Sequence, residues 1–261
     1  MLGQMVNAYF SAKNCNVVSF DVRFLPDTRE AYNEFLGKLR NAVVFNCAGR
    51  IKQKTEDVSD LLFVNSILPA DLRNLLHEDV VLINPSTDCV FDGKKGAAYD
   101  IGDFSNAFDG YGWSKRLGEV VLFGRPNTIV PRVSIVGPDA NPEGKGLMAW
   151  VLAQKGNTVK GFANHLWNGI TTLEWCKQID EFLVRNGQFD FQLLHFGTAE
   201  SYSKYDMLVL FDEVFDLGLT VEQFETPEPV DRRLLPQIVS KPLPEQLEEL
   251  KQFIAETEFW Q

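Results

Sequence analysis

Cysteine and histidine are scarce in this sequence, and neither forms clusters. The four cysteines lie far apart, the three histidines are scattered, and no Cys-x-x-Cys pair occurs. These spacings do not match the patterns of zinc sites or of small disulfide scaffolds. We therefore expect no metal site, and we expect free thiols in a reducing, cytoplasmic compartment.

Long apolar runs and basic clusters are also missing. No apolar run is long enough to span a bilayer, and no signal peptide is recognisable. The net charge is -11, from 25 Lys and Arg against 36 Asp and Glu. Without a basic patch, a chain of this charge is a poor binder of phosphate backbones. We expect neither membrane insertion nor nucleic-acid binding.

The composition that remains is that of a globular protein with a sizeable core. The chain has 261 residues, of which 45% are hydrophobic and 23% are charged. Short apolar runs alternate with amphipathic stretches, which is typical of an α/β fold with a parallel sheet. The expected strands cover residues 16–21, 42–49, 80–84, 128–137 and 191–197. The expected helices cover residues 1–10, 28–39, 59–76, 147–155, 203–214 and 243–253, with one more around Tyr111.

From residue 139 onward, the pattern changes to loops punctuated by glycine and proline. We predict a doubly wound, Rossmann-like parallel sheet over residues 1–137. A small C-terminal substrate-binding lobe over residues 138–261 should interleave with this main domain. The turn Gly144-Lys145-Gly146 opens a helix that is a candidate phosphate site, although such a turn is more often only a helix start.

Two neighbouring stretches carry the candidate chemistry. The apolar run 80–84 reads as a buried strand, so Thr87 follows at its carboxyl end, where open α/β sheets bind ligands. Tyr111 and Lys115 are four residues apart and share one helix face. A phenol titrates near pH ~10, and we expect an ammonium one turn away to lower that pKa toward the range of a general acid. Alone, the Tyr-x-x-x-Lys spacing is a weak signal. It becomes much stronger because a strand followed by the Thr87 hydroxyl precedes it at this distance in the sequence.

Together these motifs, Ser-Thr-Asp-Cys-Val-Phe-Asp-Gly at 86–93 and Tyr-Gly-Trp-Ser-Lys-Arg-Leu-Gly-Glu at 111–119, resemble those of the extended short-chain dehydrogenase/reductases. The resemblance is greatest to the dTDP-4-dehydrorhamnose reductase branch and runs from Leu2 to Leu235. It implies a catalytic triad of Thr87, Tyr111 and Lys115. It also implies reduction of a 4-keto group on a nucleotide-linked deoxysugar by NADPH or NADH. Two alternatives remain open on the same scaffold, namely a nucleotide-sugar epimerase or dehydratase, and a non-catalytic regulatory subunit that binds NAD(P) or a sugar nucleotide.

The cofactor side of the resemblance is incomplete. Met1-Leu2-Gly3 is similar to the last three positions of the family's Gly-x-x-Gly-x-x-Gly turn, but the preceding strand and the first two glycines are absent from the sequence. Three explanations compete. The sequence may start at an internal methionine of a longer product, which we favour; another segment or a partner fills the place; or tight cofactor binding is lost.

The resemblance names cofactor and substrate contacts. Asp21 would bind the adenosine ribose of NAD(H), whereas Arg23 would meet a 2'-phosphate instead. The expected cofactor contacts are Gly3, Asp21, Arg23, Ala48, Gly49 and Lys115. The expected substrate contacts are Ser86, Cys89, Arg132, Ile135, Trp167 and Arg233. Cys89 and Ile135 stand where the family usually has Tyr and Trp, which leaves the identity of the sugar open. A homodimer is a possible assembly.

Overall fold

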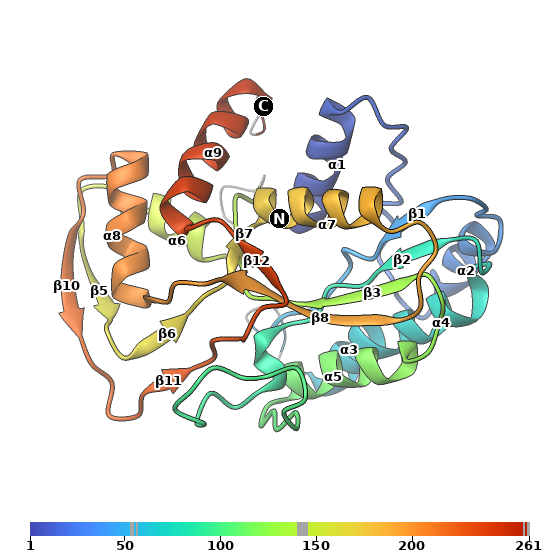
Figure 1. Cartoon of the computed structure of the whole chain (residues 1–261), viewed down its shortest axis with the longest axis horizontal. Helices are drawn as coiled ribbons and strands as arrows, with labels where there is room; N and C mark the ends of the chain where they lie inside the picture. Colours follow the sequence, from blue (N-terminus) through green and yellow to red (C-terminus); the bar gives the residue numbers. More distant parts are fainter. Residues whose placement is uncertain (53–54, 56, 140–145, 258, 260–261) are drawn as a thin grey trace.

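The structure, a computed structural model, describes residues 1–52, 55, 57–139, 146–257 and 259. A five-stranded parallel sheet forms its centre (Figure 1). In spatial order, the strands are β1 (Val43–Phe45), β2 (Val81–Ile83), β3 (Thr128–Arg132), β8 (Gln192–Thr198) and β12 (Ile238–Ser240). The predicted α/β fold with a Rossmann-like parallel sheet is confirmed.

Helices cover both faces of this sheet (Figure 1). On one face lie α1 (Leu2–Ala12), α7 (Thr172–Arg185) and α9 (Leu243–Glu256), and on the other lie α2 (Arg29–Gly37), α4 (Leu68–Leu75) and α5 (Gly110–Leu122). Each face buries its own apolar cluster, with Trp175 and Phe196 in one and Leu68 and Leu122 in the other. Because both faces are covered, the strands are apolar runs rather than alternating ones.

The helix expected over residues 59–76 is built from three consecutive segments. These are α3 (Val58–Leu62), the π-helical turn η1 (Phe63–Ile67) and α4. Pro69 lies in the first turn of α4, where its missing N–H costs little. The sequence therefore predicted the location of the helix and its proline, but not the wider turn at Asn65.

One expected strand is wrong. Residues 16–21 form no strand, and they take part in no ladder with the described residues. A parallel strand exists only by hydrogen bonding to a neighbour. The β-propensity of Val17, Val18 and Phe20 is therefore insufficient without a strand beside them.

The small lobe lies beyond the carboxyl ends of the sheet strands, at the left of Figure 1. It contains the pair β5 (Thr158–Phe162) and β10 (Thr220–Phe224), and the three strands β11 (Val230–Asp231), β6 (His165–Trp167) and β9 (Tyr202–Ser203). Its helices are α6 (Leu147–Leu152) and α8 (Lys204–Phe215). The short strands β4 (Ile135–Val136) and β7 (Ile170–Thr171) connect it to the sheet. The candidate phosphate turn at Lys145 lies outside the described residues.

A large cavity lies beside β1, the edge strand of the sheet. It has a volume of about 1030 Å³ and is enclosed by α1, the stretch 15–24, α2 and residues 39–50. Most of its lining side chains are apolar. A cavity of this size, lined in this way, is typical of sites that hold a small ligand.

A buried ion pair joins α5 to the end of β3. The guanidinium of Arg132 donates to both carboxylate oxygens of Glu119, at 2.8 Å and 2.7 Å, and both side chains are at most 2% exposed. Ser86 Oγ donates to the same carboxylate at 2.5 Å. Burial acts to raise the pKa of Glu119, but its hydrogen bonds with Arg132, Ser86 and Arg116 hold that pKa below its usual value.

The exchange Glu119→Ala tests the structural role of this pair. Removing the carboxylate leaves the guanidinium of Arg132 buried without a counter-charge, so we expect a loss of about 3–5 kcal/mol in the free energy of unfolding. Urea denaturation of the purified protein measures it. The matched control is Glu249→Ala, which breaks half-exposed pairs with Lys177 and Lys241 and should cost at most about 1 kcal/mol. Equal losses in the two variants would contradict the role of the pair.

Candidate active site

Thr87 stands where the sequence predicts it, beyond the carboxyl end of β2. It caps the short 3-10 helix η2 (Asp88–Val90), with its Oγ1 accepting from Cys89 N at 3.1 Å and donating to Asp88 Oδ1 at 3.0 Å. Its side chain is 6% exposed. The cap fixes the position of the hydroxyl before any ligand arrives.

Tyr111 lies in the first turn of α5, which is held close to the segment carrying Thr87. Asp109 caps this helix by accepting from Gly112 N at 2.8 Å. A Cβ on Gly112 would lie 2.2 Å from the carbonyl oxygen of Cys89, and one on Gly118 would lie 2.3 Å from that of Asn65. These glycines of the motif therefore allow α5 to approach its neighbours more closely than any other residue would.

The side chain of Tyr111 lies close enough to the Thr87 hydroxyl for that hydroxyl to act on the pKa of the phenol. Burial raises the pKa of Tyr111 above its usual value, the nearby thiol of Cys89 adds to this, and the Thr87 hydroxyl opposes it. Tyr111 thus keeps its proton throughout the neutral range. The expected lowering of this pKa by Lys115 is wrong for the protein alone, because burial dominates.

Lys115 lies one turn along α5 from Tyr111, on the same face. Its Nζ donates to the carbonyl oxygen of Pro85 at 2.6 Å, next to the start of the Thr87 segment. Burial lowers the pKa of Lys115 to about 8, against the charges of Glu119 and Cys47, which raise it. The site therefore holds an ammonium that is poised to lose its proton in the mildly alkaline range.

Asn65 ties the loop after β1 to α5. Its Oδ1 accepts from Arg50 N at 2.9 Å, and its Nδ2 donates to Arg50 O at 3.0 Å and to Ser114 Oγ at 2.9 Å. Every polar atom of this buried amide is thereby satisfied. The amide consequently fixes the loop on the cofactor side relative to the helix that carries Tyr111 and Lys115.

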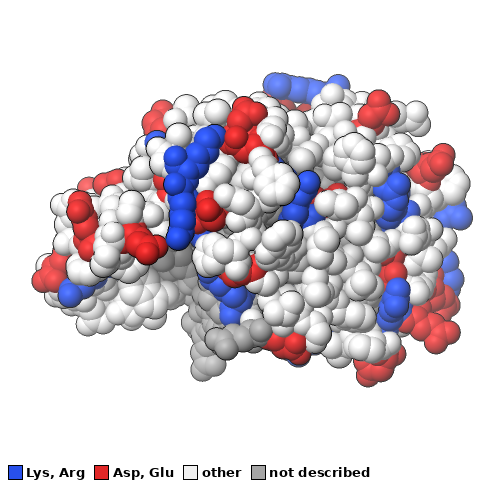
Figure 2. Space-filling model, turned by 90° about the horizontal axis from the view of Figure 1, so that it is seen from below, with Lys and Arg blue, Asp and Glu red and all other residues white. Residues whose placement is uncertain are grey.

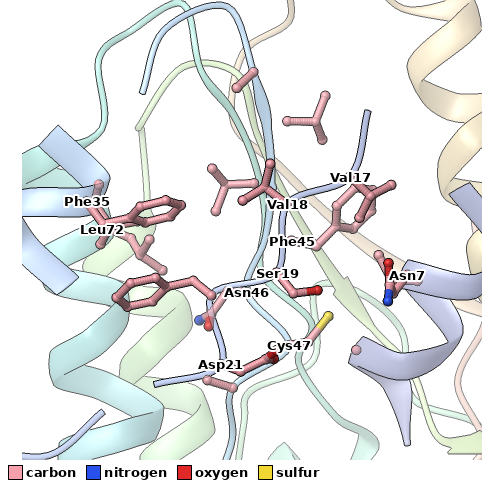
Figure 3. Close-up of a pocket in the computed structure, with 18 of the residues that line it drawn as sticks. Asn7, Val17, Val18, Ser19, Asp21, Phe35, Phe45, Asn46, Cys47 and Leu72 are labelled. Carbon is pink, nitrogen blue, oxygen red and sulfur yellow. The ribbon is translucent and has the colours of Figure 1, made fainter. Parts of the chain in front are cut away.

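Five of the six expected cofactor contacts line one cavity, and Lys115 is not among its lining residues. Gly3, Asp21, Arg23, Ala48 and Gly49 all line the cavity beside β1. Figure 3 shows residues of α1 (Asn7), of the stretch 17–21 (Ser19, Asp21) and of the end of β1 (Phe45, Cys47) around it. Small residues at the strand end and an acid and a base on the facing stretch fit the adenosine half of a dinucleotide. Asp21 and Arg23 are both exposed.

Three expected substrate contacts already have partners within the protein. Ser86 and Arg132 are both bound to Glu119 in the buried network. Arg233 is bound to Asp231 through two hydrogen bonds, of 2.8 Å and 2.7 Å. In each case, a carboxylate of the protein accepts hydrogen bonds from the side chain that was expected to contact a substrate.

The other three expected substrate contacts have different settings. Cys89 lies next to Tyr111, and burial raises the pKa of its thiol to about 12. Ile135 begins β4, paired with Ile170. Trp167 ends β6, is 4% exposed and lies under the ammonium of Lys204, with Nζ 5.4 Å from the ring centroid.

Two basic residues near Cys89 were missed by sequence reasoning. Arg232 Nη1 is 3.8 Å from Cys89 Sγ, and its buried Nε has no hydrogen-bond partner among the described residues. Lys204 is shielded at the start of α8, where burial lowers its pKa and Asp88 and Cys89 oppose this. A lysine in the first turn of a helix is unfavourable, because the N-terminal end of the helix dipole is positive. This unusual position was the feature of the sequence that could have identified Lys204. Neither forms an ion pair with a described carboxylate.

The described part of the chain offers no group of three Cys, His, Asp or Glu placed to hold a metal ion. None of its helices is long and apolar enough to cross a membrane. On the face seen in Figure 2, acidic and basic residues are interspersed.

Comparison with solved structures identifies the same architecture in sugar-nucleotide enzymes. A dTDP-4-dehydrorhamnose reductase of Clostridium acetobutylicum has a TM-score of 0.80 at 20% identity, with 97% of this chain and 96% of that one covered. The Bacillus anthracis reductase, solved in complex with NADP, also has 0.80, at 16% identity and 98% and 95% coverage. A UDP-glucose 4-epimerase of Thermotoga maritima, solved with UDP-glucose, has 0.76, at 14% identity and 99% and 96% coverage.

At these identities, the structural likeness establishes the fold alone. Comparison with curated proteins finds no match. The sequence itself, however, matches the family described as the RmlD substrate binding domain over residues 1–257. That match covers nearly the whole chain, and the chain accordingly belongs to this family of extended short-chain dehydrogenase/reductases.

Proposed function

We propose that this protein reduces a 4-keto group on a nucleotide-linked deoxysugar, with NADPH or NADH as the electron donor. The observation that carries the proposal is the closeness of Tyr111 to Thr87, with Lys115 one helical turn away on α5. Family membership supports a reductase of this class.

Each of the three residues has a distinct role in this reaction. Tyr111, which keeps its proton at neutral pH, donates it to the carbonyl oxygen as that oxygen becomes an alkoxide. The Thr87 hydroxyl, which donates to Asp88 Oδ1 in the absence of substrate, turns to donate to the same oxygen and orients the carbonyl. The ammonium of Lys115 stabilises the phenolate that Tyr111 leaves behind. A reduced nicotinamide, when bound, supplies the hydride to the carbonyl carbon.

Arg232 and Lys204 account for the charge of the substrate. A nucleotide-linked sugar carries a diphosphate, and partly shielded cations that form no ion pair with a described carboxylate are suited to bind it. Both act on the same thiol, that of Cys89 beside Tyr111. We therefore assign the role expected of Arg233 to its neighbour Arg232.

The exchange Tyr111→Phe tests the reductase. It removes the proton donor but keeps the ring, so we expect kcat to fall by about 10²–10⁴-fold, with cofactor affinity nearly unchanged. The decrease of NAD(P)H absorbance with a dTDP-4-keto-6-deoxyhexose measures turnover, and calorimetry measures binding. Tyr9→Phe is the matched control, because that hydroxyl bonds Asp180 away from the site.

Three outcomes would contradict the proposal. Turnover by Tyr111→Phe at the rate of the unmodified protein would remove the assigned role. Product formation without stoichiometric consumption of NAD(P)H would favour an epimerase or dehydratase. If neither NADH nor NADPH binds, the result would favour a non-catalytic subunit.

The pKa of Lys115 predicts a pH dependence. Below about pH 8, the side chain is charged and eases proton release from Tyr111, and above that pH it is neutral. We expect kcat/KM to fall about tenfold per pH unit above this value. Lys115→Arg keeps its charge past pH 10, so its profile should lose this alkaline limb, even if its rate is lower. An identical limb in both profiles would show that another group titrates.

Arg232 and Arg233 form a matched pair for the substrate side. Arg232→Gln removes a guanidinium that forms no ion pair with a described carboxylate. We expect KM for the nucleotide sugar to rise about 10–100-fold, which corresponds to the loss of one charged hydrogen bond. KM for NAD(P)H should not change. Arg233→Gln breaks the pair with Asp231, and its effect should be mainly on the free energy of unfolding. The reverse pattern in steady-state kinetics would restore Arg233 as the contact.

A further inference from the structure

We propose that Tyr99 is a positioning residue for the substrate side of the site, because it fixes the place of the Arg232 guanidinium beside Cys89. The consequence for binding of a nucleotide sugar rests on the function proposed above. The positioning itself is a property of the fold, and it can be measured without any substrate.

The first observation is that the chain on both sides of Arg232 is hydrogen-bonded to the loop after η2. Ahead of Arg232, Asp231 N donates to Gly93 O at 2.8 Å. Behind it, Arg233 O accepts from Tyr99 N, also at 2.8 Å. This loop lies beside β11 in Figure 1. One loop therefore holds both neighbours of Arg232.

The second observation is that the hydroxyl of Tyr99 closes this loop onto itself. The hydroxyl donates to Asp92 Oδ1 at 2.7 Å, and it accepts from Gly93 N at 3.0 Å and from Lys95 N at 3.3 Å. Tyr99 is 3% exposed, and its ring stacks on Phe91 with the centroids 4.1 Å apart. Both contacts of the loop with the chain around Arg232 consequently depend on Tyr99.

The third observation is the close approach of Gly93 to the Arg232 side chain. A Cβ on Gly93 would lie 2.9 Å from Arg232 Cγ and 3.4 Å from its Nε. The φ angle of Gly93 is +78°, a conformation that side chains disfavour. Because Gly93 N is bound to the Tyr99 hydroxyl, the phenol sets the position of the surface against which the Arg232 side chain packs.

The fourth observation is that the polar end of Arg232 has no strong partner among the described residues. Its Nη1 is 3.8 Å from Cys89 Sγ, its Cζ is 6.0 Å from the ring centroid of Phe108, and its buried Nε has no hydrogen-bond partner there. A long side chain held so weakly depends on its backbone and its neighbours for its position. Ordering it in advance lowers the entropy lost when an anion binds.

The substitution Tyr99→Phe tests the positioning, because it keeps the stacked ring and removes only the hydroxyl. NMR measures hydrogen exchange of the Asp231 amide and of the Arg232 Nε proton in the protein without substrate. We expect both to exchange about tenfold faster, since the hydrogen bonds that close the loop are lost. Tyr9→Phe, which loses its hydrogen bond to Asp180, is the matched control and should change neither rate. Unchanged rates in Tyr99→Phe would overturn the proposal.

Steady-state kinetics with NAD(P)H and a dTDP-4-keto-6-deoxyhexose tests the consequence for the substrate. In Tyr99→Phe, we expect KM for the nucleotide sugar to rise about 3–10-fold, with kcat and KM for NAD(P)H unchanged. A merely structural role would not confine the effect to one KM. In the Arg232→Gln background, Tyr99→Phe should raise KM no further, because it acts through Arg232. Equal factors in the two backgrounds would overturn the proposal.

Failure of the proposed function has a different signature. If the unmodified protein does not turn over this nucleotide sugar, the reductase is contradicted, and the hydrogen exchange of Asp231 and Arg232 still decides the role of Tyr99. If turnover occurs but the exchange rates do not respond to Tyr99→Phe, the reductase stands and the positioning role fails.

Discussion

The geometry of the site depends on the buried pair of Glu119 and Arg132. A single carboxylate receives the guanidinium from the end of β3, the Ser86 hydroxyl from the segment after β2, and Arg116 from its own helix. In a protein interior, breaking such an arrangement costs far more than forming it contributes. The pair thus fixes α5 against the strand ends, and with α5 it fixes Tyr111 and Lys115 relative to Thr87.

Burial explains the electrostatics of the site as well as its geometry. The same loss of water raises the pKa of Tyr111 and lowers that of Lys115, because in each case the charged form is disfavoured. The protein therefore holds a neutral phenol one helical turn from an easily deprotonated ammonium. The close approach of Gly112 to Cys89 brings α5 against the segment after β2.

Local patterns in the sequence were sufficient to predict the parts of the fold and of the site that depend on near neighbours. Thr87 follows from an apolar run closed by proline, and Tyr111 and Lys115 follow from helical spacing. The strand at 16–21 could not be judged in this way, because its formation depends on a partner elsewhere. The partner of Arg132 was hidden for the same reason, since Glu119 lies on another element.

The different partners of Arg232 and Arg233 have a simpler cause. Side chains two residues apart in an extended chain lie on the same side, so Arg233 lies with Asp231 and binds it, while Arg232 is directed the opposite way, toward Cys89. The acid two positions earlier was visible in the sequence. The alternation of side chains along an extended chain therefore gives the two neighbouring arginines different partners.

Because of the π-helical turn η1, the direction of the Asn65 side chain depends on the number of residues in its helix. A wider turn accommodates one residue more than an α-helix of the same rise, and each residue of an α-helix rotates the next by about 100°. If one residue of η1 were deleted, regular winding would be restored, and the amide of Asn65 would swing out of reach of Arg50 and Ser114. Natural relatives that have lost this residue would need a different way to join the loop after β1 to α5.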